Sequence, residues 1–135
     1  MSRTPTLAAV LLAACALSPS GAGADWPVFR GDPLMTGAGA AKLPDQLEER
    51  WVFKAKDAVE GAPAIVGDKV YISSLDKHLY AVELKTGKER WKVKVGAAKA
   101  SPAVRGDRVY VGTLDGKFVC LKTADGSVVW KKKLT

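Results

Sequence analysis

A tandem repeat places the strongest constraint on what this chain can fold into. Residues 62–95 reappear as residues 101–134, and a shift of 39 positions superimposes the two copies without a gap. A fixed period of this length is typical of repeat architectures, in which one unit must stack on its neighbours to cover its apolar faces. The matched positions are Pro63-Ala64 and Pro102-Ala103, Gly67-Asp68 and Gly106-Asp107, Val70-Tyr71 and Val109-Tyr110, Leu75-Asp76 and Leu114-Asp115, Gly87 and Gly126, and Trp91 and Trp130.

Each copy is expected to form four short strands. In the first copy, apolar residues occupy both sets of alternating positions from Val70 to Val82, so both faces of the sheet should be covered. Turn residues separate the strands at Gly67-Asp68, Asp76-Lys77 and Thr86-Gly87. The last strand, 89–95, places long cationic side chains on one side, which suits an exposed edge strand.

Four antiparallel strands in about 40 residues, covered on both faces and repeated in tandem, fit the blade of a β-propeller. We therefore predict an all-β fold with two full blades of four antiparallel strands, at 62–95 and 101–134. They would belong to a larger propeller of about seven or eight blades.

The end of the first copy contains a motif that supports this prediction. Residues 81–91 resemble the tryptophan-docking motif of quinoprotein (PQQ-type) propellers, in which an alanine, an acidic residue, Thr-Gly and a tryptophan recur at this spacing, although Glu83 stands where aspartate is usual. The second copy is looser, with Cys120, Lys122 and Asp125 at the alanine, acidic and threonine positions. The resemblance implies that each tryptophan packs between adjacent blades. The docking residues it identifies are Ala81, Thr86, Gly87, Trp91, Gly126 and Trp130.

Residues 1–24 are expected to be an export signal. Arg3 precedes an apolar run of 11 residues, 7–17, and Ala22-Gly23-Ala24 forms an A-x-A cleavage pattern before Asp25. A second interpretation stays open, because Leu12-Ala13-Ala14-Cys15 resembles the lipobox of bacterial lipoproteins and would make Cys15 a lipidated residue. Both interpretations place the protein in the periplasm or at the periplasmic face of the outer membrane.

Residues 25–46 are rich in glycine, proline and alanine and should form an irregular lead-in segment. Its first half resembles the lead-in sequence W-P-x-F-R-G-x-P-x-x-T-G of exported PQQ-like propeller proteins. Trp26 and Phe29 are strongly apolar, so we expect them to pack onto the propeller.

Residues 47–56 are expected to form one extra strand, because Glu49-Arg50-Trp51 matches Glu89-Arg90-Trp91. This strand would be the fourth of a blade whose first three strands do not precede it, so the partial propeller would comprise residues 47–135. Nine strands cannot tile a ring of four-stranded blades without leaving an exposed edge. The sequence therefore resembles the N-terminal part of a longer propeller.

No catalytic, cofactor-binding or metal-binding set is recognisable in the sequence. Cys120 aligns with Ala81 in a strand interior, which favours a small buried side chain over a reactive thiol. His78 is the only histidine and lies without other ligands nearby, while Asp76 and Asp115 recur at a turn that an Asx-type hydrogen bond explains. The family that the sequence resembles includes quinoprotein alcohol dehydrogenases, which hold PQQ and calcium on the ring axis. The hallmark residues of that site cannot be placed on this sequence, and a shared fold does not transfer a reaction.

Two functional hypotheses follow. The first is a non-catalytic binding or scaffold propeller of the cell envelope, similar to the propeller lipoprotein of the outer-membrane β-barrel assembly machinery. Its partners would be other proteins or further blades, and no cofactor or nucleic acid is expected. Its net charge, which falls from +7 to +6 when Arg3 leaves with the signal, would favour acidic partners or a membrane surface. The alternative is the N-terminal fragment of a PQQ-dependent quinoprotein dehydrogenase.

Overall fold

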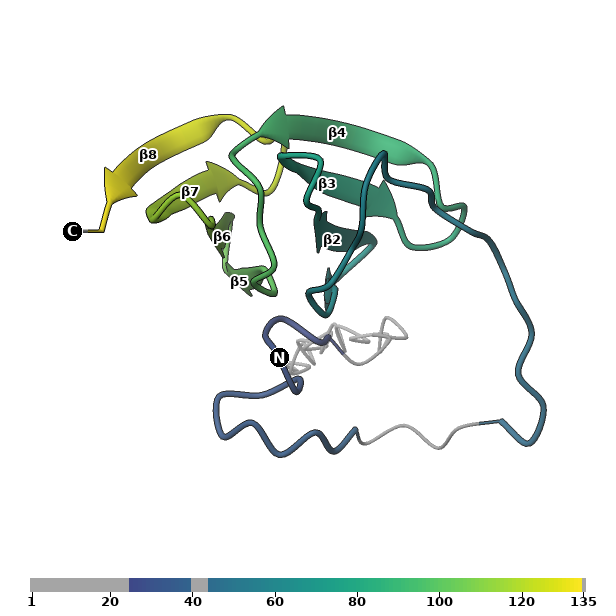
Figure 1. Cartoon of the computed structure of the whole chain (residues 1–135). Coiled ribbons are helices and arrows are strands. Elements are labelled where there is room, and N and C mark those ends of the chain that lie inside the picture. The colour runs from purple at the N-terminus through teal and green to yellow at the C-terminus, as the bar shows by residue number, and fades with distance from the viewer. Residues whose placement is uncertain (1–24, 40–43, 135) are drawn as a thin grey trace, which may run out of the picture.

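The computed structural model describes residues 25–39 and 44–134, and within them eight β-strands form two sheets (Figure 1). The predicted export signal and Cys15 lie outside the described residues. The strands are β1 (Ala64–Val66), β2 (Lys69–Ser73), β3 (His78–Glu83), β4 (Glu89–Lys94), β5 (Ala103–Arg105), β6 (Arg108–Gly112), β7 (Lys117–Lys122) and β8 (Val128–Lys133).

Each sheet is a simple antiparallel meander, in the order β1-β2-β3-β4 and β5-β6-β7-β8. The predicted pair of four-stranded antiparallel blades is therefore confirmed, and we call them blade one (β1 to β4) and blade two (β5 to β8). The turns fall at the predicted glycines, and β4 and β8 are the exposed edge strands with their long cationic side chains in solvent. The repeated sequence thus forms the same unit twice.

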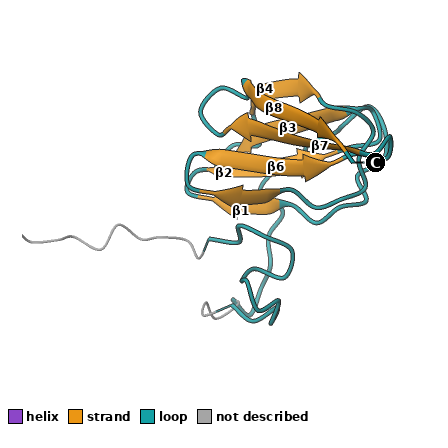
Figure 2. Cartoon of the chain, turned by 90° about the vertical axis from the view of Figure 1, so that its left-hand side faces the viewer, coloured by secondary structure: helices purple, strands orange, loops and turns teal. Residues whose placement is uncertain are grey.

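The two blades lie face to face, as the view along them in Figure 2 shows, and their inner strands β1 and β5 approach each other most closely. A continuous apolar core fills the space between them, with Tyr71 and Leu79 from blade one and Val109, Val119 and Leu121 from blade two fully buried. Burial of apolar surface on this scale is the main source of stability in such a pair, so neither blade is expected to fold without a neighbour.

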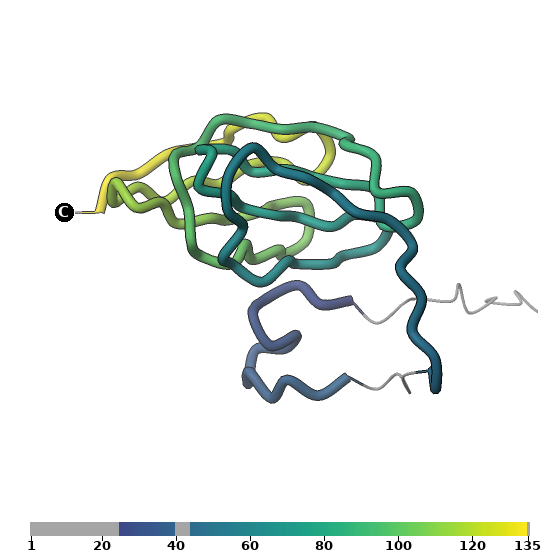
Figure 3. Tube along the Cα trace, turned by 45° about the vertical axis from the view of Figure 1, so that its right-hand side comes forward, coloured from purple at the N-terminus to yellow at the C-terminus, as the bar shows by residue number. Residues whose placement is uncertain are grey.

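The opposite face of blade one is covered by an extended segment of the same chain. Trp51, Phe53 and Ala55 pack against a second apolar cluster that includes Val70, Tyr80 and Val82. The tube in Figure 3 shows this segment running along the outside of blade one before it enters β1. Blade one is therefore enclosed between residues 51–55 and blade two.

The predicted strand at 47–56 is not formed, although its predicted alternation is present. Trp51, Phe53 and Ala55 are partly buried, whereas Val52, Lys54 and Lys56 are exposed. A fourth strand takes its ladder of backbone hydrogen bonds from the third strand of its own sheet. The described part of the chain contains no such third strand for this segment, so it lies extended and unpaired.

Candidate functional site

Trp91 lies between the two blades and makes two specific contacts with blade two. Its indole Nε1 donates a hydrogen bond to the carbonyl oxygen of Thr123, at 3.2 Å, and its ring lies over Gly126. A Cβ atom built on Gly126 would stand 2.7 Å from Cε3 of Trp91, and φ at Gly126 is +74°, so only glycine fits both the ring and the backbone. The register shifts between Ala81 and Val82, opposite Trp91, and such a bulge turns side chains out of the regular pleat.

Trp51 makes the same two contacts one blade earlier. Its Nε1 donates to the carbonyl oxygen of Leu84, at 2.9 Å, and its ring lies over Gly87. Leu84 and Gly87 are the repeat equivalents of Thr123 and Gly126. Trp51 was not among the predicted docking residues, although the match of Glu49-Arg50-Trp51 to Glu89-Arg90-Trp91 was the signal for this role.

The remaining motif residues occupy different environments. Ala81 is fully buried and lies opposite Trp91 in the β3–β4 pair. Thr86 lies at the surface, and its hydroxyl donates to Glu83, which also pairs with Arg90. The hydrogen bond from Thr86 has the largest effect, and together with that from Arg90 it holds the pKa of Glu83 below its usual range.

Trp130 has no neighbouring sheet among the described residues. Its ring lies 5.9 Å from Phe118 and 6.2 Å from Tyr110, and all three side chains belong to the outer face of blade two. The register shift recurs between Cys120 and Leu121, opposite Trp130. Trp130 therefore occupies the position that Trp91 has on its own sheet, with the partner side of the indole left open.

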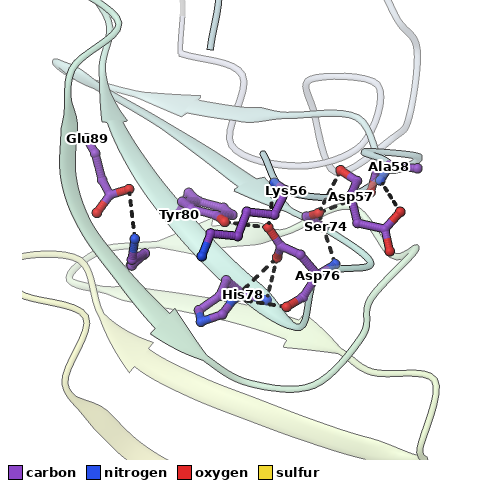
Figure 4. A network of polar contacts seen from close by, with 9 residues as sticks. Lys56, Asp57, Ala58, Ser74, Asp76, His78, Tyr80 and Glu89 are labelled. Atoms are coloured by element: carbon purple, nitrogen blue, oxygen red, sulfur yellow. Dashed lines mark hydrogen bonds and ion pairs between the residues drawn. The ribbon is translucent and has the colours of Figure 1, made fainter. Parts of the chain in front are cut away.

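A network of polar contacts centred on Asp76 ties residues 56–58 to blade one (Figure 4). The carboxylate of Asp76 accepts hydrogen bonds from the backbone N–H groups of Lys56 and His78, each at 3.0 Å, and from the hydroxyl of Tyr80, at 2.5 Å. Beside it, the hydroxyl of Ser74 lies 3.1 Å from the carbonyl oxygens of both Asp57 and Ala58. These contacts anchor the extended segment at the β2–β3 turn.

The surroundings of Asp76 shift two pKa values in opposite directions. Burial by itself would raise the pKa of Asp76, but the hydrogen bonds from Tyr80, Lys56 and His78 outweigh it and the pKa lies below its usual value. Burial, and next the hydrogen bond to Asp76, raises the pKa of Tyr80 to about 12. At neutral pH the pair is therefore a carboxylate and a neutral phenol, the combination that the hydrogen bond requires.

The other residues considered from the sequence lie apart from one another. Asp115 is half exposed and pairs with Thr113 and Lys117 in its own turn. Cys120 is buried inside blade two and forms no disulfide with any described residue. His78 is partly exposed, with its Nδ1 atom 3.0 Å from the carbonyl oxygen of Asp76. The contacts given for each of these side chains stay within one turn or one sheet.

The lead-in segment lies along the inner edges of both blades. Trp26 and Ile65 exchange two backbone hydrogen bonds, of 2.6 and 2.8 Å, and the carbonyl oxygen of Pro27 accepts from the backbone N–H of Val104 at 2.8 Å. Figure 2 shows the segment just outside β1, on the side away from β4. The backbone of Trp26 pairs with β1, but its ring lies against Gly31 of the lead-in segment itself, and the expectation that Phe29 packs onto the propeller is wrong, because Phe29 is 51% exposed.

Within residues 25–39 and 44–134, no three His, Cys, Asp or Glu side chains come together as a metal site would require. The same residues include no helix with the length and apolar character needed to cross a membrane. The polar side chains that are well ordered by hydrogen bonds, those of Asp76, Tyr80 and Ser74, connect segments of the fold. The arrangement is thus one of packing and docking contacts.

The chain is similar to a known protein family and to a solved structure with the same description. A family model described as outer membrane protein assembly factor BamB matches residues 16–135. The crystal structure of BamB from Moraxella catarrhalis superposes with a TM-score of 0.58 at 28% identity, over 63% of this chain and 27% of that one.

Dehydrogenases with the same fold also match. Quinohemoprotein alcohol dehydrogenase from Comamonas testosteroni gives a TM-score of 0.69 over 82% of this chain and 19% of that one, at 24% identity, which supports the fold alone. A polyvinylalcohol dehydrogenase from a Pseudomonas species is 32% identical over 78 residues, which are 58% of this chain and 12% of that protein. The chain therefore covers between 12% and 27% of the length of these three relatives.

Proposed function

The chain belongs to the PQQ-like β-propeller repeat family whose model is described as outer membrane protein assembly factor BamB, and from this premise we propose that it is a non-catalytic binding module of the cell envelope. Such a module presents propeller surfaces to other proteins and carries out no reaction. The hypothesis of a binding scaffold requires only stable blades, export and exposed surfaces.

The position of the lead-in segment is the observation that carries this proposal. Residues 25–27 form backbone hydrogen bonds with the inner strands of both blades, at Ile65 and Val104. In a propeller the inner strands face the ring axis, which is where the resemblance to quinoprotein dehydrogenases places their cofactor. The axial edge of these two blades is occupied by the protein's own backbone, an arrangement that suits a closed scaffold better than an open cofactor site.

The residues along the inner strands do not fit PQQ or calcium. Calcium prefers six to eight oxygen ligands, supplied largely by carboxylates, amides and carbonyls. β1 consists of Ala64, Ile65 and Val66, and β5 consists of Ala103, Val104 and Arg105, so their side chains offer no oxygen at all. These two strands therefore offer no ligand set for calcium.

The alternative, that the chain is the N-terminal part of a PQQ-dependent quinoprotein dehydrogenase, is favoured by one finding. The 32% identity with the polyvinylalcohol dehydrogenase extends over 58% of this chain. Repeat units that keep the same docking contacts resemble one another whatever the rest of the ring does, so this identity follows as readily from shared blade packing as from shared chemistry.

Reconstitution separates the two functions. The full chain would be incubated with PQQ and calcium, and dye-linked oxidation of primary alcohols and of polyvinyl alcohol would be measured, with a quinoprotein dehydrogenase as the positive control. We expect no reduction of the dye above the rate of the cofactor alone. Turnover that depends on protein, PQQ and calcium together would contradict the proposal.

The proposed site of action is the periplasm or the periplasmic face of the outer membrane. It follows from the export signal predicted at residues 1–24, with Cys15 as the candidate lipid attachment point. Expression of the chain and of C15S in a Gram-negative bacterium with radiolabelled palmitate tests the anchor. Incorporation of label that C15S abolishes supports lipidation, whereas an unlabelled chain of reduced mass in the periplasmic fraction supports simple cleavage.

A further inference from the structure

A groove opens between the two blades at the end where the β2–β3 and β6–β7 turns lie. Its volume is about 620 Å³, and we call it the interblade groove. Four lysines line it, two from each blade: Lys77, Lys94, Lys117 and Lys131. Its walls come from the two blades and from residues 95–97 of the connection between β4 and β5.

The charges in the interblade groove are strongly unbalanced. Lys117 forms an ion pair with Asp115, the acidic residue of the lining. Among the described residues, Lys77, Lys94 and Lys131 have no carboxylate within ion-pair distance. Four lysine charges against one aspartate leave three net positive charges around one concave surface, which concentrates the positive potential there.

The groove also has apolar surface. Val95 and Leu114 belong to its lining, and the side chain of Leu114 is 59% exposed. Leu114 is held in place by a backbone hydrogen bond from its N–H to the carbonyl oxygen of Ala97, at 2.8 Å. Its repeat equivalent, Leu75, makes the same type of bond to Ala58 but is only partly exposed.

From this combination we propose that the interblade groove binds an extended acidic segment of a partner protein, with carboxylates at the lysines and one apolar side chain on Leu114. Lysine ammonium groups are separate point charges on flexible stems, so they suit several carboxylates spaced along a chain. A flat bilayer surface touches only the rims of a concave site, whereas a single polypeptide strand lies inside it. Charge complementarity of this kind speeds association and weakens as salt rises.

This inference rests on the proposed function as a binding module, and its test uses the full chain. The probe is a fluorescein-labelled peptide of glutamates with one central leucine, and its binding is followed by fluorescence anisotropy at low and high salt. We expect saturable binding that weakens with salt and that is lost when the glutamates are replaced by glutamines.

A matched pair of variants locates the site. K94Q/K131Q removes two lysines of the groove, whereas K92Q/K133Q removes their repeat equivalents, which are exposed on the same two strands outside it. Both variants lower the net charge by the same amount. We expect K94Q/K131Q to weaken peptide binding about five- to tenfold and K92Q/K133Q to weaken it less than about twofold.

L114S tests the apolar contact, and we expect it to weaken binding of the leucine-containing peptide but not of an all-glutamate peptide. Equal losses in the two lysine variants would overturn the proposal, since they indicate a general effect of charge. Tighter binding to phosphatidylglycerol vesicles than to the peptide, sensitive to K94Q/K131Q, would overturn it in favour of a lipid. The dye-linked assay on the same preparation tests the proposed function separately. Alcohol oxidation by a chain that still binds the peptide would refute the non-catalytic function but not the peptide site.

Discussion

Blade one and blade two share a sequence pattern and a fold but differ in what covers them. Blade one has residues 51–55 on one face and blade two on the other, so its interior positions Tyr71 and Leu79 are 2% and 0% exposed. The equivalent positions of blade two, Tyr110 and Phe118, lie on its outer face, where Phe118 is 37% exposed. The environment of a repeat residue is therefore set by the neighbouring unit more than by its own sheet.

Asp76 and Asp115, which occupy equivalent turns, differ between the blades in the same way. The side chain of Asp76 is 6% exposed and connects three segments of the fold, whereas that of Asp115 is 49% exposed and bonds only within its turn. Asp76 accepts a backbone hydrogen bond from His78 in its turn, whereas Asp115 bonds to the side chains of Thr113 and Lys117. Of the two, only Asp76 accepts a hydrogen bond from the backbone of the neighbouring extended segment, at Lys56, and its structural importance comes from that contact.

The largest difference between the blades is expected for the docking tryptophans. W91A should lower the free energy of unfolding by about 3 kcal/mol, because it opens a cavity between the blades and leaves the Thr123 carbonyl without its indole donor. W130A removes an indole from an outer face and should cost about 1 kcal/mol. Urea denaturation of both variants, followed by circular dichroism, measures the difference. Equal losses would contradict the view that Trp91 joins the blades.

The glycine beneath Trp91 gives the next largest effect. G126A should cost about 2 to 3 kcal/mol, since the new methyl group meets the indole and φ stays in the left-handed region. G106A is the control, because Gly106 also has a positive φ, of 57°, but nothing lies within 4 Å of its Cβ position. It should cost about 1 kcal/mol from the backbone alone. If both variants unfold at the same urea concentration, the ring contact contributes nothing.

The two turn aspartates, Asp76 and Asp115, should contribute differently to the pH dependence of stability. D76N should lower stability at pH 7 by about 1 to 2 kcal/mol, because it weakens the bonds from Tyr80 and Lys56, while D115N should have the smaller effect, because Asp115 is half exposed. The pKa of Asp76 is depressed on folding, so its contribution is present above the ordinary value of 3.8 and is lost as pH falls through the lower folded value.

Stability curves measured between pH 7 and pH 2 test this assignment. The wild-type chain and D115N should both lose stability in the acid range, and D76N should show a smaller loss there. A D76N curve parallel to that of the wild type would assign the acid sensitivity to other carboxyl groups. The phenol of Tyr80, whose pKa is raised to about 12, acts in the opposite direction, and its contribution is lost as pH rises above 10.

The smallest expected effect concerns the turn that contains Lys77. Lys77 and Gly116 are repeat equivalents with φ of 76° and 73°, a conformation that costs lysine more than glycine. K77G should therefore raise the free energy of unfolding by about 0.5 kcal/mol, after the greater chain entropy of glycine is subtracted. G116A, as the reverse comparison in blade two, should lower it by about 1 kcal/mol. Destabilisation by K77G would mean that the lysine side chain itself stabilises the turn.

Much of the fold could be predicted because its signals are local. The period, the alternation of apolar residues and the turn residues identify eight strands in two meanders, and the structure has them at nearly the expected bounds. Residues 47–56 keep the predicted alternation but pair with no strand in the described part of the chain, and since a strand needs a hydrogen-bonding neighbour, the extra strand stays a prediction. The expectation for Phe29 was wrong, because an apolar side chain in a loop carries no information about its surroundings.

The candidate site was likewise predictable only where its signals are local in the sequence. The contacts of Trp91 agree with the motif, and the docking role of Trp130 stays a prediction. The motif did not indicate the role of Trp51 on Gly87, the burial of Asp76 or the lysine-lined groove. Lys94 and Lys131 stand far apart in the chain, and nothing in their local sequence distinguishes them from Lys92 and Lys133.

The sequence by itself determined the repeating unit, because strand formation, turn chemistry and the two covered faces are properties of residues within about ten positions of one another. Only the tertiary structure decided which equivalent residues are buried, which lysines converge and which edge the lead-in segment occupies. These depend on how one unit rests on the next, and that contact involves residues more than thirty positions apart, whose proximity is set by packing.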